Sequence, residues 1–318
     1  MNAITLGSNG PTIAPLGIGA WAWGDKLFWS YGKDYDKATL YDAFKTALDV
    51  GISLFDTAEI YGFGESERLL GEFMQQTDRS RSSVHIATKY FPLPWRFNAQ
   101  AVADALTASL KRLQLPTVAL YQVHQPFDFL MGQTTLLNAL ADEVKQGRTL
   151  TLGVSNYSAE QMRQAHRILA DRGIALAVNQ VPYSLLTRQI ESNGVLDTAR
   201  ELGITILAYS PLSQGLLTGK YTADNYTPPI GARRLNPQFS QSSLEKLAPT
   251  IRLLTEIGET HGKTPAQVAL NWLIAQGNVI PIPGAKNGDQ VRQNAGALGW
   301  SLSPDEREQL DRSTATSR

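Results

Sequence analysis

The fold of this 318-residue chain can be read outward from residues 150–180, LTLGVSNYSAEQMRQAHRILADRGIALAVNQ. The stretch opens with a short apolar run, Leu150–Ser155, and closes with another, Ala175–Gln180, and runs of this length are typical of buried strands. Between them, Ser158 and Gln161 have the spacing of a capping box, followed by apolar residues at helical intervals. A strand, a helix and a second strand in this order predict a parallel β-α-β unit.

The same alternation continues through the rest of the chain. Helices with recognisable ends separate the apolar runs: Gly51 would stop a helix over Ala38–Val50, and Thr264-Pro265 would start another. Six more apolar runs are candidate strands, over Leu16–Trp21, Ser53–Asp56, Val84–Lys89, Val118–His124, Thr205–Tyr209 and Val279–Pro283. Eight strands alternating with helices predict an α/β fold, a (β/α)8 TIM barrel forming one domain over residues 1–318. An open, doubly wound sheet is the alternative, but the G-x-G-x-x-G turn typical of dinucleotide-binding sheets is absent after the first strand.

Three segments depart from this alternation. Ile4–Leu6 and Thr12–Ala14 flank Asn9-Gly10, a turn pair that predicts a β-hairpin able to close the N-terminal end of the barrel. The segment FPLPWRF (91–97) and the long stretch Ser213–Ser243 read as loops, and long loops are more often functional than structural.

Composition narrows the class of protein. Lys plus Arg equals Asp plus Glu, at 29 each, so charge favours neither a nucleic acid nor an anionic membrane as partner. The chain has no cysteine, and its histidines and carboxylates do not show a zinc-like spacing, so we expect no metal. The first residues lack the features of a signal peptide, and no run approaches ~18 apolar residues, which predicts a cytoplasmic protein. The oligomeric state stays open.

Four polar residues stand at the C-terminal ends of three predicted strands. Asp56 ends the second strand and Tyr61 follows it, Lys89 ends the third, and His124 ends the fourth. In a parallel barrel these ends meet at one mouth, which is where the active site lies. A free phenol has a pKa near 10, and a neighbouring ammonium is expected to lower it, so Lys89 held by Asp56 would make Tyr61 an acid. His124 could donate a hydrogen bond to a substrate carbonyl. To reduce that carbonyl, such a site also needs a hydride source.

Seven sequence motifs follow one another along the chain: FDTAEIYG (55–62), ATK (87–89), LYQVH (120–124), GVSNYS (153–158), VNQVPYS (178–184), AYSPLSQGLLTGKY (208–221) and IPIPGAKN (280–287). On these motifs, the chain resembles the aldo-keto reductase superfamily from about Leu16 to Ala297. The aromatic segments 17–32 and 91–97 look most like the reductases of cyanobacteria and plant chloroplasts.

This resemblance implies an NADPH-dependent reduction of aldehydes or ketones with Tyr61 as proton donor. Lys89 and Asp56 would tune the tyrosine, and His124 would orient the carbonyl. Tyr209 would stack on the nicotinamide ring. The other cofactor contacts it implies are Ser155, Asn156 and Gln180 at the carboxamide, Ser210, Leu212, Gln214 and Lys220 at the pyrophosphate, and Gly284, Lys286, Gln290 and Asn294 at the adenosine end.

Two positions depart from the family pattern. Gln125 follows the histidine, where the family often has Trp or Arg, and Gln290 stands where some subfamilies have an arginine for the 2′-phosphate. Lys286 before a helix start is a natural anion site and favours NADPH. Gln290 could instead pair with Asn287 as part of a helix cap. The candidates to replace the arginine are Arg233, Arg234 and Arg292.

The pocket and the rival functions complete the prediction. Trp21 and Trp95, at or beyond strand ends, are expected to wall a substrate pocket suited to an aldehyde with an apolar or aromatic body. Two rivals remain: a cofactor-sensing binding subunit of the kind found on potassium channels, and an isomerase or aldolase with Lys89 as a Schiff-base lysine. We expect the remaining histidines to be structural or exposed: His85, His166 and His261.

Overall fold

Eight parallel strands follow one another in sequence order around a single sheet. The computed structural model describes residues 3–7, 9–127, 131–229, 233–234 and 236–315. The strands are β3 (Ile18–Gly19), β4 (Leu54–Asp56), β5 (His85–Tyr90), β6 (Val118–Val123), β7 (Thr149–Ser155), β8 (Leu176–Pro182), β9 (Thr205–Tyr209) and β10 (Val279–Pro281). Each matches a predicted strand. The largest difference is β3, two residues instead of the six predicted over Leu16–Trp21.

The first and last strands close the sheet into a barrel. The Gly17 N–H donates to the Pro281 carbonyl at 3.0 Å, and the Gly19 N–H donates to the Pro283 carbonyl at 3.0 Å. Gly19 also forms a parallel bridge with Gly284. A Cβ on Gly19 would lie 2.8 Å from the Ile282 carbonyl oxygen, so the closing contact requires glycine. The (β/α)8 barrel is therefore confirmed over the open sheet.

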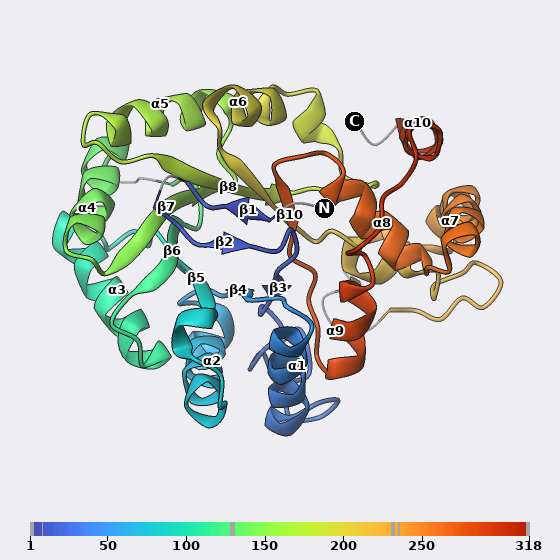
Figure 1. Ribbon diagram of the computed structural model, residues 1–318, viewed down its shortest axis with the longest axis horizontal. Coiled ribbons are helices and arrows are strands. Elements are labelled where there is room, and N and C mark those ends of the chain that lie inside the picture. Colours follow the sequence, from blue (N-terminus) through green and yellow to red (C-terminus); the bar gives the residue numbers. More distant parts are fainter. Residues whose placement is uncertain (1–2, 8, 128–130, 230–232, 235, 316–318) are drawn as a thin grey trace.

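The predicted hairpin is present and closes the N-terminal end of the barrel. β1 (Ile4–Thr5) and β2 (Thr12–Ile13) pair antiparallel. Leu6 and Ile13 are buried in one cluster with barrel-interior side chains such as Leu120. Figure 1 shows the hairpin across the middle of the ring of strands and helices.

Helices surround the barrel, and several begin with the caps that the sequence predicts (Figure 1). Ser158 with Gln161, and Thr264 with Gln267, form complete capping boxes. The α-helices of the described residues are α1 (Lys37–Asp49), α2 (Glu65–Gln76), α3 (Ala99–Leu113), α4 (Gln133–Lys145), α5 (Ala159–Ala170), α6 (Val195–Leu202), α7 (Gln241–His261), α8 (Pro265–Ile274), α9 (Gly288–Ala295) and α10 (Pro304–Ser313). In that part of the chain, none is long and apolar enough to cross a membrane.

Two loops at the C-terminal end of the barrel are long. One joins β3 to α1, and the other follows β9 and contains the 3-10 helices η4 (Ser213–Thr218) and η6 (Pro237–Phe239). Within the predicted Ser213–Ser243 loop, residues 230–232 and 235 lie outside the described residues. Both loops contribute to the cavity described next.

Candidate active site

Lys89 is the buried centre of the polar cluster at the barrel mouth. Its Nζ donates to Asp56 Oδ2 at 2.6 Å, to the Thr57 carbonyl at 2.8 Å and to the Tyr61 hydroxyl at 3.4 Å. These contacts use all three N–H donors of the ammonium. The side chain has no exposed surface and does not line the cavity, which disfavours the Schiff-base alternative.

Two glutamine side chains hold the other oxygen of Asp56. Gln180 Nε2 donates to Asp56 Oδ1 at 2.7 Å, and Gln122 Nε2 donates to the same oxygen at 3.3 Å. Gln122 was not among the site residues predicted from the sequence. The signal was a polar residue inside an otherwise apolar strand, because a buried amide needs a partner. Gly153 leaves room for it, since a Cβ there would lie 3.0 Å from Gln122 Cγ.

Burial changes the expected acidity of Tyr61. Desolvation raises the pKa of Tyr61 above its usual value, and the opposing effect of Lys89 does not reverse it. Asp56 contributes to the rise by disfavouring a second negative charge nearby. The prediction of a lowered pKa is thus wrong for the cofactor-free protein, because the sequence shows the ammonium but not the depth of burial.

Lys89 is charged and His124 is neutral. Burial opposes the charge on Lys89, but Asp56 and Tyr61 raise its pKa overall, so the ammonium persists. Burial, assisted by Lys89, lowers the pKa of His124 to about 3, so its imidazole is neutral at physiological pH. The His124 ring packs edge-on against Tyr61, with centroids 5.6 Å apart. A neutral phenol and a neutral imidazole therefore stand together where a carbonyl oxygen could accept from both.

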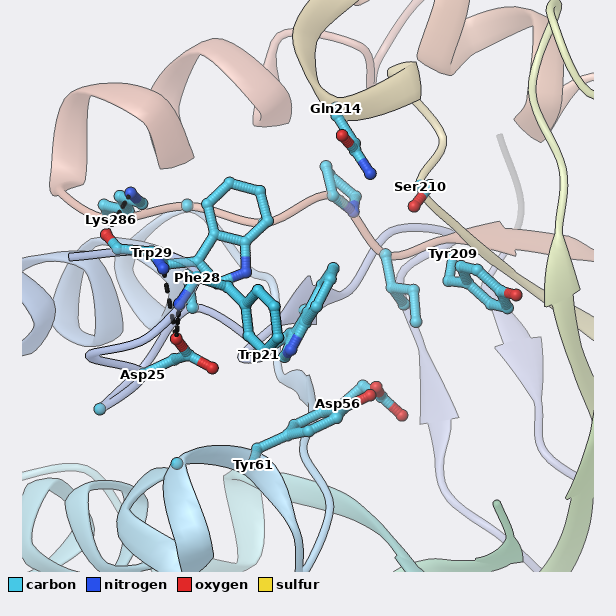
Figure 2. Close-up of a pocket in the computed structure, with 18 of the residues that line it drawn as sticks. Trp21, Asp25, Phe28, Trp29, Asp56, Tyr61, Tyr209, Ser210, Gln214 and Lys286 are labelled. Carbon is cyan, nitrogen blue, oxygen red and sulfur yellow. Dashed lines mark hydrogen bonds between the residues drawn. The ribbon is translucent and has the colours of Figure 1, made fainter. Parts of the chain in front are cut away.

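A cavity of about 1310 Å³ opens above these groups (Figure 2). Asp56, Tyr61 and His124 line its floor. In Figure 2, Tyr209, Ser210 and Gln214 lie on one side of the cavity, and Trp21, Phe28 and Trp29 lie on another. Every position that the resemblance assigns to cofactor binding lines this cavity: Ser155, Asn156, Gln180, Tyr209, Ser210, Leu212, Gln214, Lys220, Gly284, Lys286, Gln290 and Asn294.

Three of these residues have strained backbones. Asn156, Ser210 and Gln214 have positive φ values of 62°, 50° and 57°. Such conformations are uncommon outside glycine and gather at functional sites, where surrounding contacts hold them. The Tyr209 hydroxyl donates to Asn156 Oδ1 at 3.1 Å, which holds the ring beside Asn156.

Three buried polar atoms on the cavity wall fit a bound ligand. Asn294 Nδ2, Gln214 Oε1 and Trp29 Nε1 have no hydrogen-bond partner among the described residues. A buried donor or acceptor without a partner is costly, at about 1–3 kcal/mol. Asn294 and Gln214 are positions that the resemblance gives to the adenosine end and the pyrophosphate, so this set fits a nicotinamide dinucleotide.

Cationic side chains lie close together on the cavity wall: Lys286, Arg233 and Lys220. Lys286 Nζ donates to the Trp29 carbonyl at 3.2 Å, and Arg233 Nε donates to the Gln214 carbonyl at 2.9 Å. Burial and then the charge of Arg233 lower the pKa of Lys286. Lys220 also lies close enough to contribute. Like charges brought together in this way favour the binding of an anion.

The structure selects one of the three candidate arginines. Arg233 lines the cavity. Arg234 is exposed and Arg292 pairs with Asp289 at 2.7 Å, and neither lines it. Arg233 is therefore the arginine placed to assist Lys286.

The start of α9 differs from the expected open anion site. The Gly288 N–H donates to Asp42 Oδ2 at 2.8 Å, so a carboxylate already occupies this helix end. Asn287 accepts from the Gln290 N–H at 2.9 Å, and Gln290 Oε1 accepts from the Lys286 N–H at 2.8 Å. Gln290 thus lines the cavity and also braces the cap. Anion binding here depends on side chains rather than on the helix terminus.

The two tryptophans predicted for the substrate pocket differ. Trp21 lines the cavity, but Trp95 does not and is 68% exposed. The reason lies in its neighbour: Arg96 turns inward to Glu59 at 2.9 Å and to the Phe91 carbonyl at 2.9 Å. From this loop, Phe91 lines the cavity instead. Gln125, beside His124, also lines it, 3.4 Å from Asn156 Nδ2.

The other histidines do not line the cavity, as expected for structural positions: His85, His166 and His261. His261 Nε2 lies 2.8 Å from Glu306 Oε1. Over the described ranges, no group of three or more His, Asp or Glu side chains is placed to hold a metal ion.

Comparisons with known proteins test the family resemblance. A family model described as the aldo/keto reductase family matches residues 15–315. The chain is 39% identical over 309 residues to a protein named chloroplastic pyridoxal reductase from Arabidopsis thaliana, covering 94% of this chain and 83% of the relative. A solved glycerol dehydrogenase from Gluconobacter oxydans matches with a TM-score of 0.85 at 30% identity, covering 99% of this chain and 95% of that chain. An aldo/keto reductase from Klebsiella pneumoniae, in complex with NADP and acetate, matches with a TM-score of 0.74 at 28% identity, covering 97% and 95%.

Proposed function

This chain belongs to the aldo/keto reductase family and is a nicotinamide-dependent oxidoreductase, and from that premise we propose that it reduces aldehydes or ketones to alcohols with NADPH. The observation that carries the proposal is the floor of the cavity. There Tyr61 lies 3.4 Å from Lys89 Nζ and packs against the neutral His124. A cofactor-sensing subunit could carry the same four residues, so turnover decides between the two functions.

The residues of the chain supply the proton side of the reaction. A bound nicotinamide dinucleotide supplies the hydride. His124 donates a hydrogen bond that orients the substrate carbonyl, and Tyr61 gives its hydroxyl proton to the oxygen as the alcohol forms. Its raised pKa keeps the phenol protonated at neutral pH, and the Lys89 ammonium lowers the free energy of the phenolate that results. Water then returns a proton to Tyr61.

The preference for the 2′-phosphate of NADPH rests on two cations. Lys286 and Arg233 lie close enough that the charge of one lowers the pKa of the other. Neither forms an ion pair with a carboxylate within the described residues. A doubly charged phosphate would relieve their repulsion and form charge-assisted hydrogen bonds. NADH offers no such group at that position.

A substrate panel with both cofactors tests the proposal. We expect oxidation of NADPH with aromatic and aliphatic aldehydes, pyridoxal included, and a lower catalytic efficiency with NADH. Tyr61→Phe should bind NADPH as the parent does but lose roughly 10²–10⁴-fold in turnover. If Tyr61→Phe reduces 4-nitrobenzaldehyde at the parent rate, Tyr61 is not the proton donor. Tight NADPH binding by the parent without turnover of any aldehyde would instead support the sensor.

A further inference from the structure

The imidazole of His124 is not oriented by a hydrogen bond to another side chain. Its Nδ1 is buried and has no hydrogen-bond partner among the described residues. The backbone of His124 is held, because its N–H donates to the Tyr90 carbonyl at 2.8 Å. The orientation of a histidine ring is usually set by the hydrogen bond that one of its nitrogens makes. Here, contacts with neighbouring side chains take over that task.

Two aromatic rings enclose the imidazole. Tyr61 packs edge-on against His124 with centroids 5.6 Å apart and an interplanar angle of 81°. Phe91 packs against the same ring at 5.5 Å and 82°. Edge-to-face contacts of this kind have a preferred geometry, so they limit rotation of the enclosed ring. A shift of Phe91 would leave the imidazole free to turn away from Tyr61.

Glu59 connects the two loops that carry these rings. It follows β4 and lies two residues before Tyr61, and its Oε1 accepts from the Phe91 N–H, on the loop after β5, at 2.6 Å. The connection is a closed circuit. It runs from Glu59 along the chain to Tyr61, through ring contacts to His124 and Phe91, and back to the carboxylate of Glu59.

Arg96 holds Glu59 in this position. Its Nη1 donates to Glu59 Oε1 at 2.5 Å and its Nη2 donates to Oε2 at 2.9 Å, a bidentate pair. Nη1 also donates to the Phe91 carbonyl at 2.9 Å, and the guanidinium lies over the Tyr90 ring, 5.0 Å from its centroid. The side chains of Glu59 and Arg96 are only 7% and 20% exposed, so solvent screens the pair weakly. The pair therefore restrains both loops.

We propose that Glu59 and Arg96 are positioning residues, which hold the His124 imidazole through Phe91 at the angle where one carbonyl oxygen accepts from both His124 and Tyr61. This inference rests on the proposed function. Neither Glu59 nor Arg96 lines the cavity, so both act through other residues rather than on the substrate or the cofactor.

The kinetic test compares turnover with binding. Arg96→Met and Glu59→Gln should each lower kcat by roughly 10–100-fold, because a small misplacement of a catalytic group is costly, and leave the aldehyde KM and the NADPH Kd within about twofold of the parent. Arg96→Lys keeps the charge but not the bidentate geometry, so it should recover only part of kcat. A kcat within about twofold of the parent in Arg96→Met overturns the proposal.

The matched control is the ion pair between Arg148 and Glu143. These side chains are 24% and 3% exposed and lie 2.5 Å apart, which resembles the pair of Glu59 and Arg96. Arg148 lies just before β7, at the N-terminal end of the barrel, and does not line the cavity. Arg148→Met should therefore lower stability to urea about as Arg96→Met does, but keep the parent kcat. An equal loss of kcat in both variants would reduce Arg96 to a structural role.

Nuclear magnetic resonance of the imidazole nitrogens gives a readout without turnover. In the parent, burial lowers the pKa of His124 to about 3, so its ring stays neutral at about pH 5. In Arg96→Met, a displaced Phe91 would admit water, and the pKa of His124 should rise toward its ordinary value of 6.5, so that the ring titrates between about pH 5 and pH 7. Arg148→Met should titrate as the parent does, and the signal lost in His124→Asn gives the assignment.

This readout separates the two proposals. If the parent reduces no aldehyde, the proposed function fails, but a change in the His124 titration in Arg96→Met and not in Arg148→Met still supports positioning. The parent titration in both variants contradicts it. Should Arg96→Met not fold, Phe91→Leu removes the ring contact and leaves the ion pair intact, and the same loss of kcat and rise of the His124 pKa are expected. Parent values of both in Phe91→Leu would overturn the inference.

Discussion

The loops after β3 to β6 and those after β7 to β10 border the same cavity, yet the first arc is mainly apolar and the second is polar and cationic. The second arc presents unpartnered atoms such as Asn294 Nδ2 and Gln214 Oε1, which recognise a ligand by direction and distance. The first arc presents exposed apolar side chains such as Leu27 and Phe63, which offer surface area but no hydrogen bonds. A cofactor with many polar atoms suits the second arc, whereas a substrate with a single reactive carbonyl suits the first.

Both arcs contain non-glycine residues with positive φ, but in different surroundings. Asn156 and Gln214 adopt positive φ values among polar contacts, whereas Phe63 adopts one while facing water. Lys89 and Asp56 stand at the floor between the two arcs. Changes at the floor are expected to have the largest effects, followed by changes on the polar arc, in the acid–base groups and at Phe63.

The largest effect is expected at the floor. Lys89→Met should lower kcat/KM by roughly 10²–10⁴-fold, because the phenolate of Tyr61 would form beside Asp56 without a cation. It should also destabilise the fold by about 3–5 kcal/mol, since it leaves a buried carboxylate unpaired. Steady-state kinetics and urea denaturation measure the two effects.

The double variant Asp56→Asn/Lys89→Met separates stability from catalysis. Removing both charges should restore much of the stability, because the neutral amide can still accept from Gln180. Turnover should stay low. Recovery of turnover in the double variant would show that Lys89 acts only as a structural partner of Asp56.

On the polar arc, loss of one cation should change cofactor choice. Lys286→Met and Arg233→Met should each raise the Kd for NADPH by roughly 10–100-fold, as expected for a charge-assisted hydrogen bond of about 1.5–3 kcal/mol, and leave the Kd for NADH nearly unchanged. Cofactor fluorescence measures both constants. Arg234→Met is the control, because Arg234 is exposed and does not line the cavity. Equal losses for NADPH and NADH would place the cations at the pyrophosphate.

The acid–base groups predict a simple pH dependence. Burial raises the pKa of Tyr61 and lowers the pKa of His124 to about 3, so both groups stay neutral from about pH 5 to pH 8. kcat/KM should therefore vary less than about tenfold over that range. In the cofactor-free protein, the ultraviolet difference between parent and Tyr61→Phe should show phenolate forming only above pH 10.0, the ordinary value. A Tyr61 midpoint below pH 9 would contradict the dominance of burial.

The smallest effect is expected at Phe63 on the first arc. Phe63→Gly should raise the free energy of unfolding by about 1 kcal/mol or less, because glycine removes the strain of the left-handed conformation. The greater entropy of glycine in the unfolded chain offsets part of this gain. The exposed ring loses little packing on removal. Urea denaturation checks this, with Leu150→Gly as a second exposed apolar position that has no positive φ. A loss of stability at Phe63 would mean that the ring packs in solution.

The positions of loop side chains were the hardest feature to predict from local sequence patterns. Trp21 and Trp95 are both aromatic residues at or beyond strand ends, so the sequence predicts the same role for both. Only Trp21 lines the cavity, because Arg96 holds the loop of Trp95 through Glu59. The choice of Arg233 over Arg234 depends on the path of a long loop. Gln122 was overlooked because its role exists only through Asp56, 66 residues away along the chain.

The sequence by itself determined the barrel and the polar cluster at its mouth. Apolar runs of strand length alternate with capped helices, and this periodicity is local, so it survives without tertiary information. Asp56, Lys89 and His124 are at or just beyond strand ends, and the parallel topology then requires them to meet. Only the tertiary structure decided how deeply Tyr61 is buried, which set the direction of its pKa, and which loop side chains turn inward. Both depend on contacts between segments distant in sequence, where desolvation and packing outweigh local preference.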